Sequence, residues 1–128
     1  MLAANPAADV AAAIVWLPMI ASDEGSGVRD APTLVPDSRA RHFYDPARFA
    51  GRAIARSLGT PGSERQTAWD MYLFYGPDAE WHDDPPSPDA WLHQLGGRGR
   101  EWADPSRYRW SEGLVEGLLA LAAERCGG

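Results

Sequence analysis

The run from Ala11 to Ile20 contains no charged residue, and it constrains the fold more than any other stretch of this chain. Ten uncharged and mostly apolar residues fit a strand that is covered on both faces. The run is too short for a membrane helix, which needs about 20 apolar residues, and Pro18 interrupts it. No basic residue precedes it, so we do not expect a secretory signal. The sequence therefore predicts a central buried strand at 11–20.

Downstream segments carry local signals for an alternation of strands and helices. Residues 39–44 favour a second strand, and Asp45-Pro46 predicts the start of an amphipathic helix over 47–58, which Gly59 ends. Polar and glycine residues at 22–37 favour only a short helix or an irregular loop before that strand. Alternation of strands and helices in this order predicts an α/β fold.

The second half of the chain predicts a hairpin and two helices. Residues 68–75 alternate as a strand does, and the following Gly-Pro-Asp turn predicts a return strand near Glu80-Trp81. Ser87-Pro88 predicts a short helix through Leu95. The Gly- and Arg-rich residues 96–109 predict an exposed connecting segment, the crossing, and Ser111 predicts the cap of a last helix. The expected architecture is one central mixed sheet with this hairpin at its edge, flanked by helices.

The length of 128 residues fits one domain spanning 1–128. Within it we expect a core at 8–95 and a C-terminal loop and helix extension at 96–128. Eighteen acidic against twelve basic residues give a net charge of −6, which disfavours nucleic acid and anionic membranes as partners. All twelve basic residues are Arg, which excludes Schiff-base chemistry on a lysine.

Cys126 is the single cysteine, so neither an internal disulfide nor a thiolate metal cluster is possible within this chain. Its place near a helix C-terminus favours an incidental rather than a reactive thiol. This composition is typical of a reducing compartment and predicts a cytoplasmic location.

The strand ending Trp16-Leu17-Pro18-Met19, the Phe43-Tyr44-Asp45-Pro46 helix start and the strand at 68–75 together resemble a thioredoxin-like domain. The run Ala68-Trp69-Asp70-x-Tyr72-Leu73-x-Tyr75, followed by Trp81, Pro86, Trp91, His93 and Gln94, is similar to a group of bacterial thioredoxin-like proteins of unassigned activity. The resemblance covers residues 8–95 and implies a partial thioredoxin-like fold.

The chain departs from this superfamily at its chemical landmarks. Redox members carry Cys-x-x-Cys at the end of the first strand, and nothing before Val10 supplies that strand or motif. Their cis-proline before the hairpin would fall at Ala68-Trp69. No catalytic residue is therefore carried over. Two explanations stay open: a true start upstream of Met1, with catalytic cysteines in the missing segment, or a member that kept the scaffold and lost the chemistry.

Histidine and carboxylate side chains around residue 82 could carry a different chemistry. His82 and Asp83 lie on a proline-rich loop, and His93 follows nearby, so these three are candidate metal ligands. Adjacent carboxylates such as Asp83 and Asp84 are more often a solvated acidic turn than a metal site. His42, beside the aromatic residues Phe43 and Tyr44, favours a structural role.

Six tryptophans are many for this length, and Trp81, Trp91, Trp102 and Trp110 span the proline loop and the Arg-rich crossing. Core packing and a contact groove both explain them. If a groove exists, we expect its contact residues to be Trp81, His82, Trp91 and His93.

The leading expectation is a binding or interaction module, or a truncated gene product, without enzymatic activity or cofactor. A thiol-disulfide oxidoreductase with upstream cysteines is the alternative, and a metal-dependent enzyme using the His/Asp loop is the third. A protein partner or a homodimer formed across an open sheet edge is expected.

Overall fold

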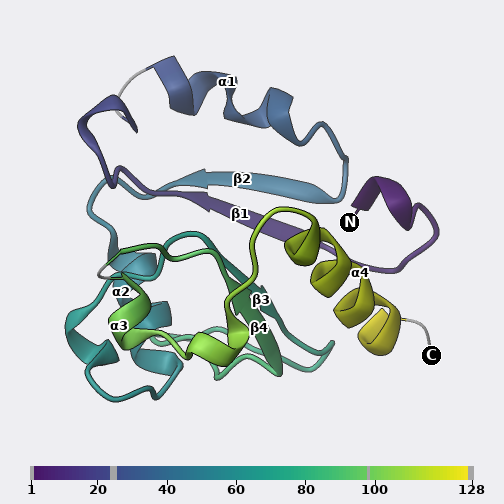
Figure 1. Cartoon of the computed structure of the whole chain (residues 1–128). Helices are drawn as coiled ribbons and strands as arrows, with labels where there is room; N and C mark the ends of the chain where they lie inside the picture. The colour runs from purple at the N-terminus through teal and green to yellow at the C-terminus, as the bar shows by residue number, and fades with distance from the viewer. Residues whose placement is uncertain (1, 24–25, 98, 127–128) are drawn as a thin grey trace. The chain divides into compact units, whose positions relative to one another are not determined.

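A computed structural model describes residues 2–23, 26–97 and 99–126 (Figure 1). The chain divides into two compact units, 1–50 and 51–128, and each is described by itself. Both strands and helices are present, which confirms the α/β class. No helix in the described ranges has the length and apolar character needed to cross a membrane.

The first unit is built around two parallel strands joined by a helix. β1 (Ala12–Trp16) and β2 (Ala40–Tyr44) pair in register from Ala12 opposite Ala40 to Trp16 opposite Tyr44, and α1 (Ser26–Leu34) connects them (Figure 1). Short 3-10 turns at Leu2–Ala4 and Ala21–Asp23 flank β1. The strand predicted at 11–20 thus exists, but it is shorter than expected, and Ala13 is exposed. Among the described residues it pairs only with β2, so it is not the central strand that was predicted.

The side chains of Trp16 on β1 and His42 on β2 link the two strands. The Trp16 indole Nε1 donates to His42 Nδ1 at 3.1 Å, and the two rings stack with centroids 6.1 Å apart. The other ring nitrogen, His42 Nε2, lies 3.4 Å from the Val35 carbonyl oxygen. The hydrogen bonding of both nitrogens agrees with the structural role expected for His42.

Arg39, directly before β2, holds the N-terminal segment in place. Its guanidinium donates to both carboxylate oxygens of Asp37, at 2.9 and 2.7 Å. The same group donates to the carbonyls of Leu2 and Asn5, each at 2.9 Å, and of Ala8 at 3.3 Å. One side chain therefore ties residues 2–8 to the sheet, which nothing local in the sequence indicates.

Replacing Arg39 by Gln is expected to raise the pKa of Asp37. The hydrogen bond from Arg39 lowers the pKa of Asp37 from 3.8 to about 2. A lowered folded-state pKa means that the pair stabilises the protein above the ordinary pKa, and that this contribution disappears as the pH falls from about 4 towards 2. An NMR titration should give an Asp37 pKa of about 2 for wild type and a higher pKa for Arg39→Gln, in which the backbone N–H of residue 39 still donates to the carboxylate. Arg41→Gln, two residues along the chain, is the control, and an unchanged Asp37 titration in Arg39→Gln would contradict the assignment.

The helix predicted after Asp45-Pro46 forms, but it begins later than expected. α2 runs Phe49–Ser57, and Asp45 caps it by accepting the Ala50 N–H at 2.7 Å. Pro46 lies in the preceding turn rather than at the first helical position, because Arg48 has a positive φ of 58° and delays the helix. Gly51 and residues 53–55 of α2 are buried, whereas Phe49 is 70% exposed.

The second sheet differs from the expected hairpin. β3 (Met71–Phe74) pairs antiparallel with β4 (Ala90–His93), Met71 opposite His93 and Phe74 opposite Ala90. The return strand predicted at 80–81 and the helix predicted at 88–95 are therefore both wrong. All four residues of β4 are buried, so its sequence lacks the alternation that distinguishes a half-exposed strand from a buried helix.

The Arg-rich crossing at 96–109 is exposed at residues 96, 97, 100, 101, 105 and 106, whereas Trp102 and Ala103 within it belong to the core. It contains α3 (Gly99–Trp102) and a 3-10 turn at Pro105–Arg107, and it leads to α4 (Glu112–Cys126), which begins directly after Ser111 as predicted. Residues from the helix, the strand ends and the crossing form one buried cluster: Ile54, Ala55, Ala68, Leu95, Trp102 and Ala103.

The strands form two separate two-stranded sheets in the described residues, where the sequence predicted one central mixed sheet. Residues 51–128 form one compact unit, and Trp102 and Ala103 lie in its buried cluster with Leu95.

Candidate functional site

The connection between β3 and β4, residues 75–89, is the hairpin loop, and hydrogen bonds close its base. The Asp89 N–H donates to the Phe74 carbonyl at 2.9 Å, and the Gly76 N–H donates to the Asp89 carboxylate at 2.6 Å. A Cβ on Gly76 would lie 3.2 Å from that carboxylate, so the small residue allows the close approach. The loop therefore begins and ends at a defined point.

The later half of the hairpin loop is held against α2. The Arg56 guanidinium lies 3.0 Å from the Asp84 carboxylate, and the Ser87 hydroxyl donates to the Ser57 carbonyl at 3.1 Å. Pro85, between these two contacts, is buried. These contacts hold residues 84–89 against α2. They do not involve the earlier half of the hairpin loop, which projects.

The projecting half, from Gly76 to Asp83, is exposed at every residue. Trp81 is 50% exposed, which is unusual for the largest apolar side chain. His82 lies beside it with its Nε2 3.2 Å from the Glu80 carboxylate, and the His82 side chain is 80% exposed. Two of the four contact residues expected from the sequence are thus accessible.

His93, expected at the contact surface, is fully buried. Its Nε2 lies 2.9 Å from the Asp104 carbonyl oxygen and its Nδ1 accepts the Leu95 N–H at 3.2 Å, which fixes the tautomer with the proton on Nε2. The Tyr108 ring meets it edge-on with centroids 5.7 Å apart. His93 therefore joins β4 to the crossing that follows it.

Asp104 is positioned for this bond by its own side chain. Its carboxylate accepts the Ser106 N–H at 2.9 Å and the Ser106 hydroxyl at 2.7 Å, and these hydrogen bonds lower the pKa of Asp104. The side-chain cap starts the 3-10 turn, with Pro105 at its first position. The Asp-Pro-Ser sequence is the local signal that fixes the acceptor for His93.

Trp91, the fourth expected contact residue, is 6% exposed and belongs to the core. The Arg107 guanidinium lies 4.8 Å from the centre of its ring and also donates to its carbonyl at 3.3 Å. Trp102 is likewise buried, at 8% exposed, whereas Trp110 is 65% exposed. The four tryptophans therefore separate into two core residues and two surface residues, and they do not line one groove.

The proposed metal ligands His82, Asp83 and His93 do not form a metal site. Both nitrogens of His93 are engaged with backbone groups, while His82 and Asp83 lie on the exposed half of the hairpin loop. Across residues 2–23, 26–97 and 99–126, no group of three or more His, Cys, Asp or Glu side chains is placed to hold a metal ion. The Cys126 thiol lies outside the described side chains.

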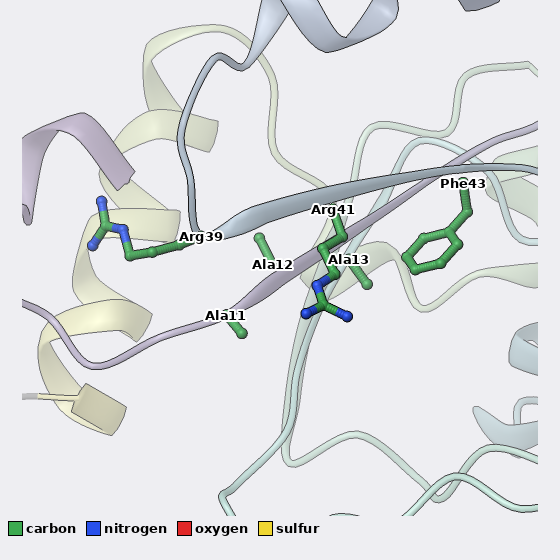
Figure 2. Close-up of a pocket in the computed structure, with 6 residues that line it drawn as sticks. All are labelled: Ala11, Ala12, Ala13, Arg39, Arg41 and Phe43. Atoms are coloured by element: carbon green, nitrogen blue, oxygen red, sulfur yellow. The ribbon is translucent and has the colours of Figure 1, made fainter.

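The first unit carries a shallow hollow that the sequence reasoning missed. It has a volume of about 280 Å³ and is lined by residues 11–13, Arg39, Arg41 and Phe43. Figure 2 shows Arg41 and Phe43 extending from β2 to the same side of the sheet as the methyl groups of Ala11 and Ala13. The signal that could have revealed the hollow is the run of alanines at 11–13 on one strand together with Arg41-x-Phe43 on its neighbour.

Comparison of the chain with known protein families, curated proteins and solved structures finds no match.

Proposed function

We propose that this chain is a thioredoxin-like domain that acts as a binding module rather than as an enzyme. The order of its elements supports this: a strand, helix and parallel strand are followed by a helix, an antiparallel strand pair and a closing helix. The resemblance in the sequence implies the same order. With Cys126 as the single cysteine, a dithiol reaction has no second sulfur within this chain.

The hairpin loop is the observation that carries the binding role. Connections of this length without a helix or strand are uncommon in compact domains and usually serve recognition. This loop is closed at its base by Asp89, held in its later half by Arg56, and exposed in the half that contains Trp81. A large aromatic side chain held at the surface on an anchored loop is typical of a binding hot spot.

The charges around Trp81 favour a basic partner. Asp84 is paired with Arg56 and Glu80 lies beside His82, while Asp78 and Asp83 have no ion pair in the described part of the chain. An Arg or Lys of a partner gains both a cation–π contact with the indole and attraction to these carboxylates. The partner class is therefore a peptide segment with an Arg or Lys next to an apolar residue. The hairpin loop carries these carboxylates without any Arg or Lys of its own: Asp78, Glu80, Asp83, Asp84 and Asp89.

Selection of displayed random peptides on the folded chain tests this proposal. We expect enriched peptides to combine Arg or Lys with an apolar neighbour, and calorimetry to show at least tenfold weaker binding to Trp81→Ala, about 1.4 kcal/mol. Asp78→Asn with Asp83→Asn should weaken binding mainly at low salt, because exposed charges are screened at high salt.

Trp110→Ala is the matched control, because Trp110 is also exposed but lies away from the hairpin loop in sequence. Equal binding by wild type and Trp81→Ala, or enrichment of peptides without basic residues, would refute the proposed site. If no peptide is enriched and light scattering reports a dimer, the partner is a second copy of the chain, joined through the open edges of the two-stranded sheets.

The proposal also places the protein in a reducing compartment, the cytoplasm. The support is compositional: one cysteine in 128 residues is the usage of proteins that do not rely on disulfides.

A further inference from the structure

The face of the β1–β2 sheet that carries Arg41 combines a cation with an apolar floor. Side chains alternate along a strand, so Ala13 lies opposite Arg41 on this face, and Phe43 follows two residues along β2. Ala11 and Ala13 contribute only methyl groups, which leaves the hollow of about 280 Å³ between the longer side chains (Figure 2). Phe43 is 51% exposed.

The two arginines that line the hollow differ in what they already bind. Arg39 is committed to the Asp37 carboxylate and to the N-terminal carbonyls. Arg41 is exposed and has no carboxylate or carbonyl partner in the described ranges. A guanidinium offers parallel N–H donors that match a planar carboxylate in a bidentate arrangement. In the described residues, the hollow therefore offers one guanidinium, that of Arg41, that is able to bind a carboxylate in the bidentate arrangement.

We propose that this hollow binds a small organic monocarboxylate with an apolar body. The carboxylate pairs with the Arg41 guanidinium, and the apolar body lies on the methyl groups of Ala11 and Ala13 beside the Phe43 ring. Arg41 and Phe43 are two residues apart on one strand, a separation of roughly 7 Å, which a short alkyl or aryl acid spans. Among the described residues that line the hollow, Arg41 is the one cation without a carboxylate or carbonyl partner, and it matches one negative charge, whereas phosphate groups usually take several donors.

This site is independent of the hairpin loop, because all its residues belong to the first unit and Trp81 belongs to the second. Failure of either proposal therefore leaves the other standing.

NMR titration of the full chain with hexanoate tests the site. We expect saturable shifts at the amides of Ala11, Ala13, Arg41 and Phe43, and at least tenfold weaker binding of acetate, which lacks the apolar body, and of hexanol, which lacks the charge. Arg41→Gln should weaken hexanoate binding at least tenfold. Ala13→Leu should do the same without a change of charge, because the larger side chain fills the hollow.

Arg29→Gln, at an exposed arginine of α1, is the control and should bind hexanoate as wild type does. An unchanged affinity in both Arg41→Gln and Ala13→Leu, with dispersed spectra showing that each variant is folded, would overturn the site. Inorganic phosphate binding as tightly as hexanoate would overturn the ligand class. Arg41→Lys keeps the charge and loses the bidentate geometry, so we expect intermediate affinity.

Discussion

Replacing His93 by Ala is expected to lower the free energy of unfolding by about 3 kcal/mol or more. The substitution leaves the Leu95 N–H without its acceptor, at a cost of about 1–3 kcal/mol, and it opens a cavity where a fully buried ring now lies. It also removes the hydrogen bond from His93 to the Asp104 carbonyl, which still accepts the Arg107 N–H at 3.1 Å. Urea denaturation followed by circular dichroism measures the loss.

Two further variants separate hydrogen bonding from packing at this position. His93→Phe keeps a ring but makes neither hydrogen bond and leaves the Leu95 N–H without an acceptor, so most of the loss should remain. His82→Ala removes an exposed imidazole and should change the stability by no more than about 0.5 kcal/mol. A loss below 1 kcal/mol in His93→Ala would show that the bonds to Leu95 and Asp104 do not hold the crossing on β4.

Trp102→Ala is expected to cost about 3–5 kcal/mol, the range for a large aromatic residue removed from a core. Trp102 is 8% exposed and belongs to the buried cluster with Leu95 and Ala68, so its removal leaves a cavity that the small neighbours cannot fill. Thermal and urea unfolding should both report the loss.

Trp110→Ala changes the same residue type eight positions along the chain, where the side chain is 65% exposed. It should alter the stability by no more than about 0.5 kcal/mol. Similar losses in Trp102→Ala and Trp110→Ala would contradict the separation of the tryptophans into core and surface residues.

Local patterns were sufficient for several elements. The apolar run before Trp16 predicted β1, although with boundaries too wide, and Asp45 predicted the start of α2 to within a few residues. Ser111 marked the beginning of α4. Each of these signals lies within the element or directly beside it, which is why the sequence alone contains it.

Pairing and burial were not predictable in the same way. The sequence suggested a tight hairpin at Gly76, but β3 pairs with β4 across the whole hairpin loop, because a short return strand at 80–81 would place acidic residues where Trp91 and Leu92 now pack. Loop closure costs little more for a longer loop, and burying β4 outweighs that cost.

In the candidate sites too, some features were predictable from local sequence and others depend on the tertiary fold. The sequence predicted a contact surface that includes Trp81, His82 and His93. Trp81 and His82 are exposed, whereas His93 was assigned to the same surface because it follows nearby in sequence. Only the fold shows that His93 faces Asp104 inside the core. The Arg41 hollow was missed because its parts lie on two strands, joined by a register that no single segment encodes.

By itself, the sequence determined the α/β class, the approximate positions of β1, β2, α2 and α4, and the lack of a dithiol. Tertiary structure alone decided which strand pairs with β3, which tryptophans are buried, and how Arg39 ties down residues 2–8. The reason is the range of the interactions: periodicity and caps act over a few neighbouring residues, whereas pairing, burial and ion pairs depend on residues that only the folded chain brings together.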